Sequence, residues 1–281
     1  MKLLRYGEPG REKPGLLDAE GAIRDLSGEV EDIAGDVLLP ESLERLRALD
    51  PTGLPKVDGA PRLGPCVGKI GKFPAIGLNY EDHAKESGLA IPAEPVLFMK
   101  ATSCICGPND DTIVPHGSEK LDYEVELGIV VGKPGSYIPE AEAAGHIAGF
   151  CVVNDVSERK FQIESTGQWV KGKSADSFGP IGPWLVTPDE IADPQKLAIW
   201  LEVDGERRQD GNTATMIFNV YHIVSYLSRF MSLQTGDVIT TGTPPGVALG
   251  MDPPRFLEVG STVRLGIDGL GEQEQRIVAA R

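Results

Sequence analysis

Cysteine is scarce in this chain, with four residues among 281. They are Cys66, Cys104, Cys106 and Cys151, and four cysteines in a chain of this length do not make a disulfide framework. The pair at 104 and 106 lacks companions for a zinc site, so alternate packing positions in a strand are its expected role. We therefore expect reduced thiols and a cytoplasmic protein.

Basic residues are also few compared with acidic ones. Lysine and arginine number 27 against 42 aspartates and glutamates, which gives a net charge of −15. Such a chain disfavours nucleic acid and anionic membranes as partners. No apolar run approaches the length of a membrane span, and the N-terminus reaches polar residues and glycine too early for a signal peptide. We expect a small-molecule partner, with no nucleic acid and no membrane.

Short apolar runs between turn residues dominate the rest of the pattern. Residues 1–66 are predicted to form a small N-terminal domain with a helix over 40–50 and a proline-rich linker at its end, and 67–281 a larger domain. One stronger helix is predicted over 220–231. Regular βαβ alternation is absent, so the pattern predicts a β-rich α+β fold. The strand-like runs of the larger domain are 73–78, 96–100, 123–131, 147–154, 184–186, 198–203, 238–241 and 262–267.

The most informative stretch runs from residue 122 to 131, where carboxylates occupy alternate positions at its start. Alternate side chains of a strand share a face, so Asp122, Glu124 and Glu126 are predicted to point the same way. Carboxylates this close repel one another unless a cation lies between them. Hard ions such as Mg²⁺ and Mn²⁺ take oxygen ligands and suit such a set. An antiparallel strand with one wet acidic face is the alternative interpretation.

Two polar residues, Asn154 and Asp155, close the buried run that starts at residue 147. If this strand neighbours the acidic one, Asp155 joins Glu124 and Glu126 in a three-carboxylate site. Such a site leaves positions open for water and substrate oxygens, which is how Mg²⁺ is usually held. An ordinary strand terminator or helix N-cap is the alternative role for the Asn-Asp pair.

Three further segments carry candidate groups. His83 and Glu86 lie three residues apart on a predicted short helix, where the carboxylate would make the histidine a better general base; a surface ion pair is the alternative. Lys173, on a loop rich in glycine and proline, could stabilise an oxyanion or be a solvated lysine. The run 240–247, which includes Thr243, could hold a substrate carboxylate or form a simple turn.

In this order the segments resemble the fumarylacetoacetate hydrolase family over about residues 70–270. Residues 1–66 resemble the small leading domain of bacterial members. The resemblance is greatest to the 2,4-diketo-3-deoxy-sugar-acid hydrolases, whose relatives are often labelled ureidoglycolate lyases. The matching segments are 76–80 with His83 and Glu86, 98–100, 122–128, 154–159, Gln162, Lys173 with residues 177–183, and 241–244.

The resemblance implies a mixed β-sandwich roll, usually in a homodimer, with bound Mg²⁺ or Mn²⁺. His83 and Glu86 would lie on a lid that orders when substrate binds, and Lys173 would face the reacting carbonyl. The metal ligands that it implies are Glu124, Glu126 and Asp155. The residues that it implies along the substrate site are Lys100, Arg159, Gln162 and Thr243.

The reaction implied is hydrolysis of a carbon–carbon bond in a 2,4-diketo acid, an acylpyruvate or a 2,4-diketo-3-deoxy sugar acid, to pyruvate and a carboxylic acid. Oxaloacetate decarboxylation and ureidoglycolate cleavage are alternatives at the same metal site, and a metal-stabilised binding protein is the non-enzymatic one. Family members that cut aromatic diketones place an aromatic residue shortly after the glutamine. Here residues 163–167 are Ile-Glu-Ser-Thr-Gly, so the sequence favours a polar substrate.

Overall fold

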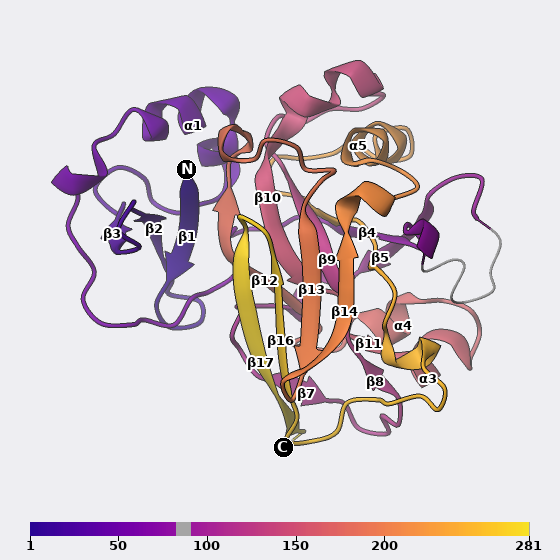
Figure 1. The fold of residues 1–281 in the computed structure, drawn as a ribbon. Helices are drawn as coiled ribbons and strands as arrows, with labels where there is room; N and C mark the ends of the chain where they lie inside the picture. The colour runs from indigo at the N-terminus through magenta and orange to yellow at the C-terminus, as the bar shows by residue number, and fades with distance from the viewer. Residues whose placement is uncertain (83–90, 281) are drawn as a thin grey trace.

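Two main β-sheets make up most of the fold, which we describe from a computed structural model over residues 1–82 and 91–280. Figure 1 shows one sheet lying in front of the other, with few helices around them. Strands of the two sheets contact each other directly, since β9 touches β13 and β10 touches β17. The β-rich α+β class predicted from the sequence is therefore confirmed.

The larger sheet carries the strands on which the sequence places its acidic residues. Most neighbouring pairs are antiparallel, but β15 pairs with β4 in the parallel direction. In order across the sheet, its strands are β3 (Ile23–Asp25), β2 (Lys13–Leu17), β1 (Lys2–Tyr6), β12 (Gly179–Val186), β10 (Ile147–Asn154), β9 (Val125–Val131), β15 (Val238–Thr240), β4 (Phe73–Gly77) and β5 (Val96–Lys100), with β6 (Ile105–Cys106) paired to β12.

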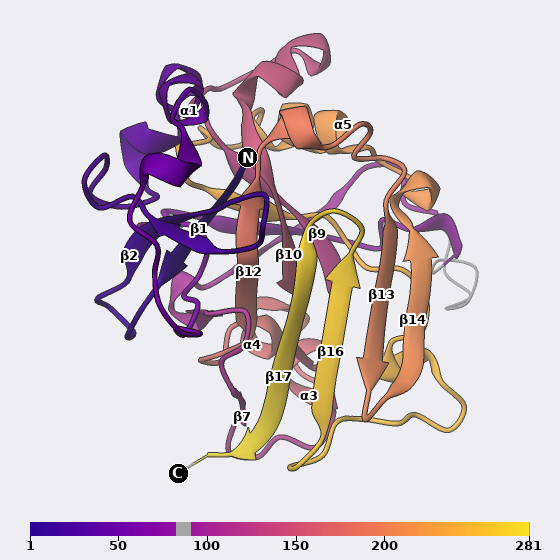
Figure 2. The same ribbon diagram turned by 60° about the vertical axis from the view of Figure 1, so that its left-hand side comes forward.

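The second sheet lies toward the viewer in Figure 2 and covers the central strands of the first. Every residue of β9 and β10 is buried, which is why both strands read as nearly continuous apolar runs. The strands of the second sheet, in order, are β14 (Glu206–Asn212), β13 (Ala198–Val203), β16 (Thr262–Ile267), β17 (Gly271–Ala279) and β7 (Thr112–Val114). A separate pair is formed by β8 (Leu121–Asp122) and β11 (Ser157–Glu158).

The N-terminal residues continue the larger sheet. Strand β1 pairs antiparallel with β12, with Lys2 opposite Val186 and Leu3 opposite Leu185. Helix α1 (Pro40–Arg47) follows and buries Leu43 and Leu46. A hydrogen-bonded sheet thus crosses the predicted boundary at residue 66, and the division into two domains stays a prediction.

The α-helices of the described chain are short. They are α1, α3 (Arg159–Ile163), α4 (Val170–Lys173) and α5 (Val220–Leu227). The side chain of Asn219 begins α5 by accepting hydrogen bonds from the amides of Tyr221 and His222. The helix ends at Leu227, earlier than the predicted residue 231. No helix in residues 1–82 or 91–280 is both long and apolar enough to cross a membrane.

Several strand predictions are confirmed to the residue, namely those over 96–100, 147–154, 198–203 and 262–267. The prediction for the cysteine pair is only half right, because Cys104 ends a 3₁₀ turn and Cys106 alone lies in a strand, β6. All four thiols are free. Strands β14 and β17 have no counterpart among the predicted runs.

Candidate active site

Three buried carboxylates converge at one end of β9 and β10. One ligand oxygen from each of Glu124, Glu126 and Asp155 lies within 4.8 Å of the others. Strand register explains the arrangement, because Val125 pairs with Asn154 and the next residues of the two strands are therefore neighbours. The amide of Asp155 donates to the carbonyl of Glu124 at 2.9 Å. The sequence interpretation of a shared carboxylate cluster describes this geometry, and we call it the acidic cradle.

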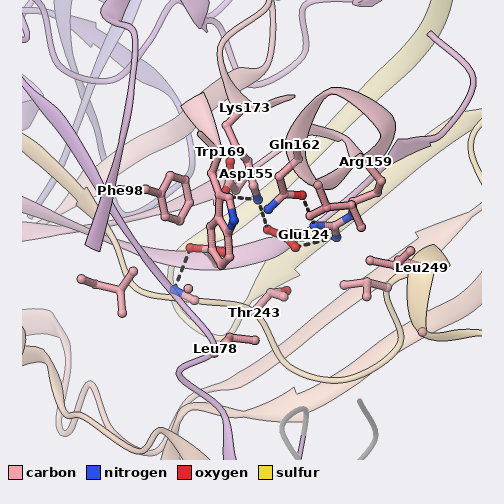
Figure 3. A pocket seen from close by; sticks show the side chains of 17 residues that line it. Leu78, Phe98, Glu124, Asp155, Arg159, Gln162, Trp169, Lys173, Thr243 and Leu249 are labelled. Carbon is pink, nitrogen blue, oxygen red and sulfur yellow. Dashed lines mark hydrogen bonds and ion pairs between the residues drawn. The ribbon is translucent and has the colours of Figure 1, made fainter. Parts of the chain in front are cut away.

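Three cations lie against the acidic cradle. Lys173 Nζ is 2.5 Å from Glu124 Oε2 and 2.7 Å from Asp155 Oδ2. Each of the other two cations contacts one carboxylate of the cradle. Lys100 Nζ lies 2.5 Å from Asp155 Oδ1, and Arg159 Nη2 lies 2.6 Å from Glu124 Oε1. All three side chains are buried, so the ion pairs are shielded from water. Figure 3 shows Lys173 and Arg159 reaching the carboxylates from different elements.

Two carboxylates of the acidic cradle, Glu124 and Glu126, have pKa values that are shifted in opposite directions. Burial alone would raise the pKa of Glu124, but the positive charges of Arg159 and Lys173 outweigh it and hold the pKa at about 2. Burial, with the negative charges of Asp155 and Glu124, instead raises the pKa of Glu126 well above its usual value. Glu126 Oε2 is held by the Thr240 hydroxyl and by the Gly242 amide at 2.7 Å. The acidic cradle thus has room for more positive charge beside Glu126.

A hard divalent cation fits this position beside Glu126. Three carboxylate oxygens with open positions for water and substrate are the ligands that Mg²⁺ and Mn²⁺ take. The donor set contains no thiolate and no imidazole among the described residues, so soft metals are poorly matched. Glu124, Glu126 and Asp155 are therefore the residues that would hold Mg²⁺ or Mn²⁺.

Lys173 reaches the acidic cradle because two short helices pack unusually closely. It is the last residue of α4, and the residue before it, Gly172, lies directly against α3. A Cβ on Gly172 would lie 2.5 Å from Gln162 Cβ and from the Glu158 carbonyl oxygen. Burial would lower the pKa of Lys173, but Asp155 and Glu124 raise it, so the ammonium stays charged.

A cavity of about 370 Å³ opens beside the acidic cradle, a size typical of small-molecule sites. One of its wall residues, Leu78, has a φ of +54°, which is a rare and costly conformation for leucine. Its neighbour Asn79 fixes the backbone there, with its side chain bonded to the Phe218 amide and the Thr241 carbonyl. Strain stabilised by surrounding contacts is characteristic of functional sites.

Most of the predicted site residues meet at this cavity. Glu124, Glu126, Asp155 and Lys173 form its charged side, and the wall also includes Arg159, Gln162 and Thr243. Lys100 departs from the prediction, because its side chain is fully buried behind Asp155 and is not part of the wall. Its role is to neutralise Asp155. The predicted pair His83 and Glu86 lies outside the described residues.

A family model described as fumarylacetoacetate (FAA) hydrolase C-terminal matches residues 72–278. The chain belongs to this family. A protein of Burkholderia multivorans is 64% identical to this chain, and the match covers all of both chains. The name of that protein says hydrolase and gives no substrate. The fold expected from the resemblance is thereby confirmed.

Solved structures of this fold carry the names of hydrolases and of isomerases. The fumarylacetoacetate hydrolase of Exiguobacterium antarcticum is 35% identical, with a TM-score of 0.88 and full coverage of both chains. Maleylpyruvate hydrolase of a Sphingobium species, solved with manganese(II) and pyruvate, is 25% identical, with a TM-score of 0.83 and full coverage of both. Members of the fumarylacetoacetate hydrolase family are thus enzymes.

Sequence reasoning missed two aromatic residues of the site. Phe98 lies on the cavity wall two positions before Lys100, and strand alternation could have indicated that the two share a side of β5. Trp169 also lines the cavity, but it lies between two short helices and has no periodic signal.

Asp122 is not one of the carboxylates of the acidic cradle. Its carboxylate accepts a hydrogen bond from Arg159 Nε at 2.8 Å and anchors that side chain.

Proposed function

We propose that this protein hydrolyses a carbon–carbon bond in a 2,4-diketo acid of the acylpyruvate type, with pyruvate and a carboxylic acid as products. The observation that carries the proposal is the contact of Lys173 with the metal-suited carboxylates Glu124 and Asp155. A permanent cation at this point would lie beside a diketo acid chelated by the metal, which supports the proposal. The complex of maleylpyruvate hydrolase with manganese(II) and pyruvate supports the same product.

The charges of the site indicate separate roles for the metal ion and for Lys173. A divalent cation held by Glu124, Glu126 and Asp155 would stabilise the enolate of the departing pyruvate. Lys173 stays protonated, so it acts as a hydrogen-bond donor to the oxyanion that forms at the attacked carbonyl, and not as a base.

Water activation needs a base from elsewhere. Among the described wall residues, the ionisable groups are the three cradle carboxylates, Arg159 and Lys173. The carboxylates are committed to cations or to a metal, and both cations are protonated. His83, oriented by Glu86, is the group that we propose takes the proton from water.

Turnover of a substrate panel with Mg²⁺ and with chelator tests the proposal. The panel holds acetylpyruvate, a 2,4-diketo-3-deoxy sugar acid, oxaloacetate and ureidoglycolate, and products are identified by mass. We expect pyruvate plus a carboxylic acid, abolished by chelator. Pyruvate with CO₂ alone would indicate a decarboxylase, which does not need His83, and urea would indicate a lyase. If no compound is turned over, the hydrolase proposal fails.

Gly172→Ala is expected to damage activity without touching a reacting group. The new methyl would meet backbone and Cβ atoms at 2.5 Å, so α4 must move away from α3 and carry Lys173 with it. We expect turnover to fall about tenfold to a hundredfold and the free energy of unfolding to fall by about 1–3 kcal/mol. Gly28→Ala, where nothing lies within 4 Å of the new Cβ, is the control. Unchanged turnover in Gly172→Ala would contradict the positioning of Lys173 by this contact.

A further inference from the structure

An aromatic wall begins directly beside Lys173. Its ammonium nitrogen lies 5.3 Å from the centre of the Phe98 ring. Phe98 in turn meets Trp169 edge to face, with ring centres 5.3 Å apart and planes at 62°. Figure 3 shows both rings next to the acidic cradle. A group bonded to a carbonyl that faces Lys173 would therefore lie beside these rings.

The position of Trp169 depends on a glycine in β4. A Cβ on Gly77 would lie 2.5 Å from Trp169 Cζ3, so the indole packs against bare backbone. No larger residue could occupy position 77 without moving the ring. The ring is held on its second side by Phe98. Two independent contacts thus fix Trp169 in the wall of the cavity.

The rest of the wall on this side is also apolar. Leu78 and Leu249 line the cavity in Figure 3. Together with the two rings they present an apolar surface, whose side chains carry one hydrogen-bonding group, the indole N–H of Trp169. The other aliphatic residues of the described wall are Ile76, Ile163 and Val247.

The cations of the described wall are already paired with carboxylates of the protein. Arg159 donates from Nε to Asp122, from Nη2 to Glu124 and from Nη1 to Gln162 Oε1. Lys173 is bound to Glu124 and Asp155. An acyl group that ends in a carboxylate would lose its hydration beside the apolar wall and would have to compete with Asp122, Glu124 and Asp155 for these cations, so burying its charge here is unfavourable.

The polar side chains of the wall are largely committed as well. The Thr243 hydroxyl donates to the Val125 carbonyl at 2.9 Å and accepts from Gln209 Nε2 at 2.8 Å. Gln162 Oε1 accepts from Arg159. The hydroxyl groups of a sugar-acid tail would therefore find few partners among the described residues.

We propose that the acyl subsite of this protein, formed by Phe98, Trp169 and the aliphatic wall, takes an uncharged, apolar acyl group, alkyl or aromatic. The proposal rests on the hydrolase function proposed above and names its substrate class. The sequence favours a polar substrate because no aromatic residue follows Gln162 closely. The structure points the other way, since Trp169 returns to the site from further along the chain.

A matched substrate pair tests the proposal by turnover. Crotonylpyruvate and fumarylpyruvate differ only in a terminal methyl or carboxylate. We expect kcat/KM with Mg²⁺ to be at least about tenfold higher for crotonylpyruvate. Trp169→Ala and Gly77→Ala should each reduce this ratio at least about threefold, whereas Phe230→Ala, a ring on the surface outside the wall, leaves it unchanged. A ratio that favours fumarylpyruvate overturns the apolar subsite and leaves the hydrolase standing.

Binding separates the subsite from the chemistry. The Mg²⁺-loaded protein is titrated calorimetrically with 2-oxohexanoate and with 2-oxoadipate, which have equal carbon chains and differ in the terminal group. We expect 2-oxohexanoate to bind at least about tenfold more tightly, with the difference reduced in Trp169→Ala. If this preference is found but neither acylpyruvate is cleaved, the proposed function fails and the subsite stands. Equal binding, tighter binding of 2-oxoadipate, or binding of neither overturns the subsite.

Discussion

Glu126→Gln is expected to abolish metal-dependent turnover while leaving the metal-free protein folded. Burial and the neighbouring carboxylates raise the pKa of Glu126, which without metal favours the neutral form that glutamine resembles. Glutamine can still accept from the Thr240 hydroxyl and the Gly242 amide. It cannot supply a carboxylate to a metal ion. We expect turnover with Mg²⁺ to fall by more than about 100-fold, because even the indirect partners of a metal ligand contribute 10-fold to 100-fold.

Thermal unfolding gives the second readout for this variant. In the parent protein, saturating Mg²⁺ should add about 2.7 kcal/mol to the free energy of unfolding at a hundred times its Kd, and in Glu126→Gln this gain should largely vanish. The metal-free stability should stay within about 1.5 kcal/mol of the parent, since glutamine keeps the two hydrogen bonds that Glu126 accepts. Glu142→Gln, at an exposed position, is the matched control. Full metal-dependent turnover in Glu126→Gln would remove it from the ligand set.

Lys173→Met is expected to separate metal binding from catalysis. The variant loses the donor to the developing oxyanion, and removal of one such donor costs about 10²–10³ in turnover. It also leaves Glu124 and Asp155 with less positive charge, so the metal-free protein should lose roughly 3–5 kcal/mol of stability. Metal should bind more tightly, because the ammonium no longer competes for the same two carboxylates.

Added Mg²⁺ should therefore restore the stability of Lys173→Met and not its activity. The combination distinguishes a catalytic lysine from a merely structural one, for which metal would restore both. Lys171→Met changes an exposed lysine of the same short helix and should behave like the parent protein. Weaker metal binding in Lys173→Met, or turnover close to the parent, would argue against the role that we give to Lys173.

The acidic cradle was within reach of sequence reasoning because it depends on local rules. Alternation in the chain that leads into β9 places Glu124, just before the strand, and Glu126 together, and a polar end on the neighbouring strand adds Asp155. The cations were harder to place. Nothing in the sequence distinguishes Lys100, which is buried beneath Asp155, from a lysine that faces substrate.

Two long strands, β14 and β17, escaped prediction because their buried residues are mostly polar. In β17, Gln273 and Gln275 are buried and alternate with exposed glutamates, so the strand reads as surface. Their amides serve the neighbouring sheet: Gln273 Nε2 donates to the carbonyls of Val152 and Gly182. In β14 the buried residue is Gln209, whose side chain accepts from the Val125 amide. Such partners become visible only once the two sheets are packed.

The contact between Trp169 and Gly77 was also out of reach. The two residues are far apart in the chain, and neither belongs to a periodic pattern. The missing side chain at position 77 has meaning only when the indole lies against it. Specificity of this site is therefore encoded in a tertiary contact, whereas its metal chemistry is encoded in strand alternation.

The most direct test of the central claim is cleavage of an alkyl acylpyruvate in ¹⁸O-labelled water with Mg²⁺, followed by mass analysis of the carboxylic acid. We predict one ¹⁸O atom in each molecule of acid, formed together with pyruvate, and no reaction once the metal is chelated. That result requires water to attack the acyl carbonyl. Release of CO₂ without a labelled acid, or undiminished cleavage in chelator, would contradict metal-dependent carbon–carbon hydrolysis at the acidic cradle.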